Sequence, residues 1–139
     1  MEDEITIYFL RHGRSRADDE GVHEGRYDSP LTEVGRAQVV ARAEYFKESG
    51  TQFDCIISSS LVRASESART IGESLNVLVE LDDDWMEMDN RPLAGLSFDD
   101  AEARYPQPGF RNPYELFHSV GESEWAFHRR AVSALEKVM

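Results

Sequence analysis

The sequence is poor in cysteine, in basic side chains and in long apolar runs. Cys55 is the one cysteine among 139 residues, which excludes an internal disulfide and a cysteine-rich zinc site. No apolar run approaches the roughly 20 residues of a membrane-spanning helix. The acidic start, MEDEI, lacks the basic residues that open a secretory signal. We therefore expect a cytoplasmic protein with no membrane partner.

The deficit of basic side chains gives the chain a strong negative charge. Lys and Arg number 15 against 27 Asp and Glu, for a formal net charge of −12. A field of this sign repels nucleic acid as well as anionic membranes, so no nucleic-acid partner is expected. A local cluster of Arg11, Arg14 and Arg16 stands out against this background. It indicates either an anion-binding site or a solvated basic turn.

Strand-like and helix-like segments alternate along a length that suits one domain, residues 1–139. Apolar stretches predict strands at Ile5–Leu10, Phe53–Ser58 and Val77–Leu81. Helical spacing and capping residues predict helices that open at Thr32, cover Leu61–Leu75 and Phe98–Tyr105, and open again near Ser123. Such alternation predicts an α/β fold, with a mostly parallel sheet between layers of helices.

Residues capable of chemistry follow each of the three predicted strands. Arg11-His12-Gly13 follows the first strand, Ser58-Ser59-Ser60 and Arg63 follow the second, and Glu87 lies a few residues beyond the third. Parallel sheets bind ligands beyond the carboxyl ends of their strands. We therefore expect these side chains to meet at one edge of the sheet.

These residue types suit phosphoryl transfer. Arginine holds phosphate through two parallel hydrogen bonds, and the amides that open the helix after Ser60 would add a further anion site. Cations beside His12 disfavour the protonated imidazole, and a neutral imidazole can attack phosphorus to form a phosphohistidine. Glu87, among other carboxylates, could protonate the leaving alcohol. No metal and no cofactor is required, because arginines supply the positive charge.

Five blocks of the sequence resemble, in order, the histidine phosphatase superfamily, the phosphoglycerate-mutase-like proteins. The blocks are LRHGRS (10–15), GRYDSPLTEVGRAQ (25–38), SSLVRASESA (59–68), EMDNRPLAG (87–95) and GES (121–123), the last followed by Arg129 or Arg130. Together they run through nearly the whole chain. Five ordered blocks at compatible spacing are far more specific than any one of them.

The resemblance implies a three-layer α/β/α domain and a set of site residues. His12 would be the nucleophile that becomes phosphorylated, and Glu87 the proton donor. The expected phosphate or substrate ligands are Arg11, Arg63, Ser15, Asp18 and Gly25. Asp18 departs from the pattern, because family members often have asparagine at this position.

The resemblance also implies a strand that these 139 residues do not contain. Family members continue past the last helix into a strand that ends in a second His-Gly and lies beside the first strand. Here the chain stops at Glu136-Lys137-Val138-Met139. We therefore expect a longer chain with further C-terminal strands, a rearranged sheet, or a partner chain, for example in a homodimer, that supplies the missing edge.

Three functions are compatible with these residues. The leading one is a phosphomonoester hydrolase that acts through phosphohistidine on a small anionic phosphorylated metabolite. Mutase-type phosphoryl transfer is less favoured, because the segment of residues 96–120 is too short for the insertion that the family's glycolytic mutases carry. The third is a non-catalytic phosphate-binding module, which Asp18 and the absent second histidine favour. Phosphotransfer signalling ranks last, because His12 lies on a strand-end loop and not on an exposed helix.

Overall fold

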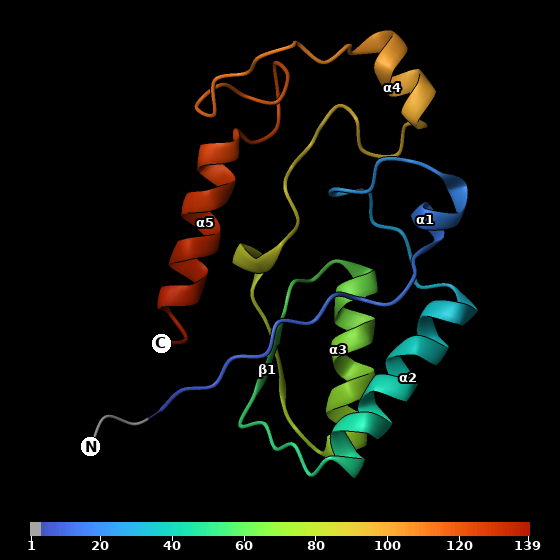
Figure 1. Ribbon diagram of the computed structural model, residues 1–139, viewed down its shortest axis with the longest axis vertical. Helices are drawn as coiled ribbons and strands as arrows, with labels where there is room; N and C mark the ends of the chain where they lie inside the picture. The colour runs from blue at the N-terminus through green and yellow to red at the C-terminus, as the bar shows by residue number, and fades with distance from the viewer. Residues whose placement is uncertain (1–3) are drawn as a thin grey trace.

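The structure is a computed structural model that describes residues 4–139 (Figure 1). The acidic start, residues 1–3, lies outside the described part of the chain. No helix of the described residues is long and apolar enough to cross a membrane. In chain order the elements are α1 (Arg16–Glu20), α2 (Glu33–Glu48), β1 (Ile56–Ser58), α3 (Val62–Leu75), β2 (Val79–Leu81), the 3₁₀ helix η1 (Asp83–Trp85), α4 (Phe98–Arg104) and α5 (Glu124–Glu136).

A small parallel sheet lies at the centre of the molecule. β1 and β2 pair with Ile56 opposite Val79 and Ser58 opposite Leu81, and α3 connects them. Helices α2 and α3 lie on one side of the strands, and α5 lies on the other side against η1 (Figure 1). This arrangement confirms the predicted α/β fold with a parallel sheet.

The main apolar core lies where α2 and α3 meet. It consists of Leu31, Val39, Ala43, Phe46 and Ile71, each less than a tenth exposed. Side-chain caps fix the starts of three predicted helices: the hydroxyls of Thr32, Ser97 and Ser123 accept hydrogen bonds from Gly35, Asp100 and Ala126 N–H. These helices begin where the sequence predicts because the capping residues are local signals.

The strand predicted at Ile5–Leu10 is wrong. This segment belongs to no ladder of the described sheet, and its apolar side chains are exposed, with Phe9 at 71%. Its side chains nevertheless alternate: Tyr8 packs edge-on against Phe46 and Phe53, whereas Phe9 lies 6.2 Å from the ring of Trp85. The sequence has the period of a strand, but a strand also needs a neighbour for its backbone groups.

Candidate active site

Two glycines set the turn that carries His12. A Cβ placed on Gly13 would lie 2.3 Å from the carbonyl oxygen of Gly35, and one on Gly35 would lie 2.1 Å from that of Arg14. The loop after Leu10 and the first turn of α2 therefore touch backbone to backbone, which any side chain would prevent. This contact fixes the chain directly after His12.

The imidazole of His12 is held from both ring nitrogens. Nδ1 lies 2.7 Å from the carbonyl oxygen of Gly13, so this nitrogen carries the hydrogen. Arg63 Nε donates to Nε2 at 3.2 Å, which requires a lone pair there. The hydrogen bond from Nδ1 to the backbone thus fixes the ring so that the lone pair of Nε2 points towards Arg63.

Arg63 lies in the first turn of α3, and only 2% of its side chain is exposed. Its two terminal nitrogens donate to the carbonyls of Tyr27 at 3.0 Å and Gly25 at 2.7 Å. Gly25 has a positive φ of 48°, and a Cβ there would lie 1.8 Å from Asn90 Oδ1. Only glycine therefore fits at this position, and its carbonyl acts as a fixed acceptor for Arg63.

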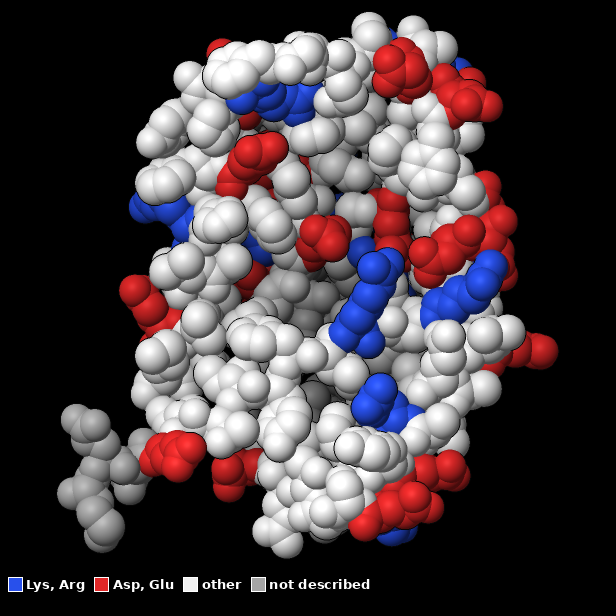
Figure 2. Space-filling model, viewed as in Figure 1, with Lys and Arg blue, Asp and Glu red and all other residues white. Residues whose placement is uncertain are grey.

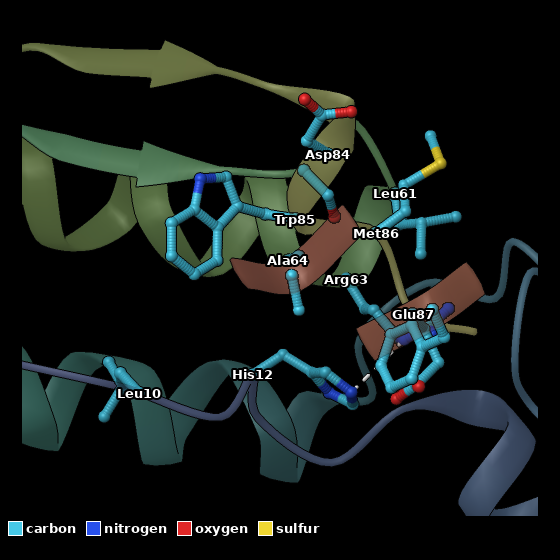
Figure 3. Close-up of a pocket in the computed structure, with 12 residues that line it drawn as sticks. Leu10, His12, Leu61, Arg63, Ala64, Asp84, Trp85, Met86 and Glu87 are labelled. Carbon is cyan, nitrogen blue, oxygen red and sulfur yellow. Dashed lines mark hydrogen bonds between the residues drawn. The ribbon is translucent and has the colours of Figure 1, made fainter. Parts of the chain in front are cut away.

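His12, Arg63 and Glu87 line one cavity of about 260 Å³ (Figure 3). Its walls come from the loop at His12, the start of α3, η1 with the residues after it, and α5. Trp85 and Leu10 contribute apolar surface. The face of the molecule in Figure 2 is hollowed near its middle, with acidic and basic side chains around the hollow. The structure therefore brings together three of the predicted site residues.

The side chain of Glu87 is exposed, whereas arginine side chains contact its backbone carbonyl. Its Oε1 accepts from Met88 N–H at 2.8 Å. Its carbonyl oxygen lies 3.4 Å from Arg26 Nε and 3.4 Å from a terminal nitrogen of Arg130. Arg130, on α5, also donates to the carbonyls of Asp84 and Met86, each at 2.8 Å. Four backbone contacts to arginine thus place the segment that ends in Glu87.

Glu122 holds Arg130 in that position through two hydrogen bonds, at 2.8 and 2.7 Å. Burial raises the pKa of Glu122, but hydrogen bonds from Arg130 and from Asp89 N–H, with the charges of Arg130 and Arg26, outweigh burial and lower that pKa below its ordinary value. The Glu122–Arg130 pair holds the segment that ends in Glu87. In the sequence, only the GES block and the arginines after it point to this pair.

Three other predicted ligands lie elsewhere. Arg11 is exposed and is not among the residues that line the cavity. Ser15 is buried and caps α1 together with Asp18, whose carboxylate accepts from Ser15 N–H at 2.8 Å. That backbone hydrogen bond is the main cause that lowers the pKa of Asp18. Ser15 and Asp18 therefore shape the loop beside His12 in this structure.

The anion site expected at the start of α3 is already occupied by the protein's own carboxylates. Asp83 accepts from Ser60 N–H at 3.0 Å, and Asp28 accepts from Val62 N–H at 2.7 Å. Hydrogen bonding from Ser60 lowers the pKa of Asp83. The expectation that these amides are free for phosphate is wrong, because two acidic loops fold back onto them.

Glu24 is a site residue that the sequence reasoning missed. Its carboxylate lies 3.2 Å from Arg63 Nε and 3.5 Å from His12 Nε2, and it accepts a hydrogen bond from the Ser15 hydroxyl. The available signal was its place directly before the block that starts at Gly25, but a lone Glu among 27 acidic residues carries little information. No group of three or more His, Cys, Asp or Glu in residues 4–139 is arranged to hold a metal ion.

Several curated proteins are similar in sequence to most of this chain. A phosphoglycerate mutase of the 2,3-bisphosphoglycerate-dependent kind from Methylobacterium sp. (strain 4-46) is 33% identical over 126 residues, which cover 86% of this chain and 61% of the mutase. The bifunctional protein Rv2228c of Mycobacterium tuberculosis is 36% identical over 101 residues, which cover 73% of this chain and 28% of that protein. The chain thus spans between about a quarter and three fifths of these relatives.

Solved structures resemble it as well. A mycobacterial glucosyl-3-phosphoglycerate phosphatase, solved as a complex with VO3, superposes with a TM-score of 0.79 at 29% identity over 93% of this chain and 62% of the phosphatase. The family model described as histidine phosphatase superfamily (branch 1) matches residues 7–139, a stretch that contains His12, Arg63 and Glu87. The chain belongs to the histidine phosphatase superfamily, branch 1.

Proposed function

We propose that the protein is a phosphomonoester hydrolase that acts through a phosphohistidine at His12 on a small anionic phosphorylated metabolite. One observation carries this proposal: Nδ1 of His12 bonds to a backbone carbonyl while Nε2 faces Arg63, in a cavity that Glu87 also lines. A nucleophile, a buried cation and a carboxyl group meet in one place, as a two-step phosphoryl transfer requires.

In the first step the Nε2 lone pair attacks phosphorus, and the bond from phosphorus to the alcohol oxygen breaks. Glu87 gives its proton to the leaving alkoxide, which departs as an alcohol. Arg63 stabilises the charge on the phosphoryl oxygens. In the second step water attacks phosphorus, the P–N bond breaks, and Glu87 takes the proton from water. Inorganic phosphate leaves, and His12 and Glu87 return to their starting states.

The comparisons support this chemistry without separating hydrolysis from transfer between substrates, because they include a phosphatase and a mutase. The length of the segment of residues 96–120 does not separate the two, because the mutase aligns with 86% of this chain over 126 residues and so carries no long insertion there. The test measures phosphate released from p-nitrophenyl phosphate and from 3-phosphoglycerate, against isomerisation of 3-phosphoglycerate in the presence of 2,3-bisphosphoglycerate. We expect release of phosphate to dominate.

Substitution of the nucleophile gives the decisive comparison. His12→Ala should lower the phosphatase rate at least about 1,000-fold, because the covalent step is lost. It should also abolish acid-labile labelling of the protein by ³²P. His128→Ala, on the exposed part of α5, is the matched control and should keep both. A His12→Ala protein with the rate of the unmodified chain would refute the mechanism.

A non-catalytic phosphate-binding module is the second candidate, and one observation favours it over a hydrolase. The Glu24 carboxylate lies 3.5 Å from His12 Nε2, where it hinders attack of that nitrogen on phosphorus. Such a module would bind inorganic phosphate, but it would release none from either substrate and its His12 would not be labelled by ³²P. The same assays therefore separate the two functions.

A further inference from the structure

Glu24 brings a carboxylate to the place where positive charge is concentrated. It lies in the connection between α1 and α2, four residues beyond the end of α1, with 16% of its side chain exposed. Its oxygens contact Arg63 Nε at 3.2 Å and His12 Nε2 at 3.5 Å, and they accept from the hydroxyls of Ser15 and, at 3.5 Å, Ser29. Glu24 thus contacts Arg63, the cation that a bound phosphate would use.

The position of this carboxylate coincides with that of a reacting phosphoryl group. A nucleophile and the atom that it attacks lie about 3–3.5 Å apart before reaction. Glu24 Oε2 lies 3.5 Å from the attacking nitrogen, on the side of Arg63. A phosphoryl group placed for attack by Nε2 and bonded to Arg63 would therefore overlap with the Glu24 carboxylate.

In this resting position Glu24 does not act as the acid for the leaving alcohol. In an in-line displacement the leaving oxygen lies on the far side of phosphorus from the nucleophile, whereas Glu24 Oε2 lies 3.5 Å from the attacking nitrogen itself. A carboxylate in this place repels a bound phosphate, because like charges brought together at a partly buried site destabilise the complex.

We infer that Glu24 is an internal anion: it occupies the phosphoryl site of the resting protein, and a phosphorylated ligand binds only by displacing it. This inference rests on the proposed function only in that both use the same site. Glu24 then sets the affinity of the site for phosphate, while His12 and Glu87 perform the chemistry. Its displacement leaves Arg63 without a carboxylate until phosphate takes over that contact.

The test compares affinity for inorganic phosphate, measured by isothermal titration calorimetry on the 139-residue chain. Glu24→Gln keeps the size of the side chain and an oxygen that accepts from Arg63, but it removes the negative charge. We expect this variant to bind phosphate at least about tenfold more tightly than the unmodified chain, a modest fraction of the expected repulsion. Orthovanadate should show the same ratio.

Glu20→Gln is the matched control, because it removes one exposed carboxylate four residues away, whose partners are Arg16 and the Tyr27 hydroxyl. Its affinity should stay within about twofold of the unmodified chain, because exposed charges contribute little. The inference would be overturned if Glu24→Gln bound phosphate no more tightly than the unmodified chain. It would also be overturned if Glu20→Gln gained as much phosphate affinity as Glu24→Gln. The first result would show that Glu24 does not compete with phosphate, and the second that only net charge matters.

A structure of the unmodified chain with vanadate bound tests the inference even if Glu24→Gln does not fold. The Glu24 carboxylate should have left Arg63, with vanadate oxygens in its place; a carboxylate still bonded to Arg63 beside bound vanadate would contradict the inference. Neither readout requires turnover. A protein with tighter phosphate binding in Glu24→Gln but no labelling of His12 would retain the inference and refute the proposed hydrolase.

Discussion

The buried side chain of Arg63 contacts both His12 and the loop of residues 24–27. It bonds to two backbone carbonyls, to the imidazole and to the Glu24 carboxylate. A phosphate ligand would use only part of this bonding capacity. Arg63 therefore stabilises the folded loop even when no ligand is bound, and its removal affects folding as well as affinity.

Replacement of this arginine should be costly for stability. Arg63→Met removes the cation paired with the partly buried Glu24 carboxylate and the donor of two backbone carbonyls, and we expect the free energy of unfolding to fall by about 3 kcal/mol. Urea titration followed by circular dichroism measures the change. Arg69→Met, an exposed arginine on the same helix, should change it by less than about 0.5 kcal/mol. Equal effects of the two would mean that the Arg63 contacts add no stability.

Among the elements, α5 supports the site through one ion pair. Arg130 connects α5 to the backbone of Asp84, Met86 and Glu87, and Glu122 fixes the guanidinium from the turn before the helix. The segment with the proposed proton donor is thus positioned by a charged pair and not by a sheet ladder. Its stability should therefore depend on pH.

The sign of this dependence follows from the lowered pKa of Glu122. A carboxyl group whose pKa is lower when folded stabilises the protein above its ordinary value, here 4.5, and this contribution is lost as the pH falls towards the folded value. Glu122→Gln does not titrate. At pH 7 it should be less stable by about 1–3 kcal/mol, because hydrogen bonds between charged groups are lost.

The difference in unfolding free energy between the unmodified chain and Glu122→Gln should shrink steadily below pH 4.5. Urea titrations at half-unit intervals from pH 7 to pH 3 measure it. Glu115→Gln, which replaces an exposed carboxylate in the preceding segment, is the control and should change the unfolding free energy at pH 7 by less than about 0.5 kcal/mol. A difference that is constant over this range would show that Glu122 has the same pKa in the folded and unfolded states.

At the level of elements, local signals were enough to predict four of the five α-helices found in residues 4–139. Thr32, Ser97 and Ser123 cap their helices through contacts three residues away, so sequence alone locates these starts. The short helix α1 was missed, because its five residues, RADDE, have no apolar periodicity, and its Ser15–Asp18 capping box was hidden in a charged loop. Strand ends were less predictable, since pairing partners lie far away in the chain.

For the molecule as a whole, the motif residues predicted where the cavity forms, and His12, Arg63 and Glu87 do line it. The motifs did not predict which charges neutralise one another inside it. The contacts of Asp28 and Asp83 with the amides at the start of α3, and of Glu24 with Arg63, join residues 23 to 39 positions apart. A chain with 27 acidic side chains offers many such partners, and only the folded structure selects among them.

The position of Trp85 in the cavity wall gives the protein an optical probe of its own site. The chain has two tryptophans, and Trp125 is half exposed beside Tyr114, away from the cavity lining. Indole emission responds to the charge and water around the ring. Trp125→Phe should therefore leave a fluorescence signal that changes as inorganic phosphate fills the cavity, with a midpoint equal to the calorimetric Kd. Trp85→Phe should be silent, and the opposite pattern would place phosphate elsewhere on the molecule.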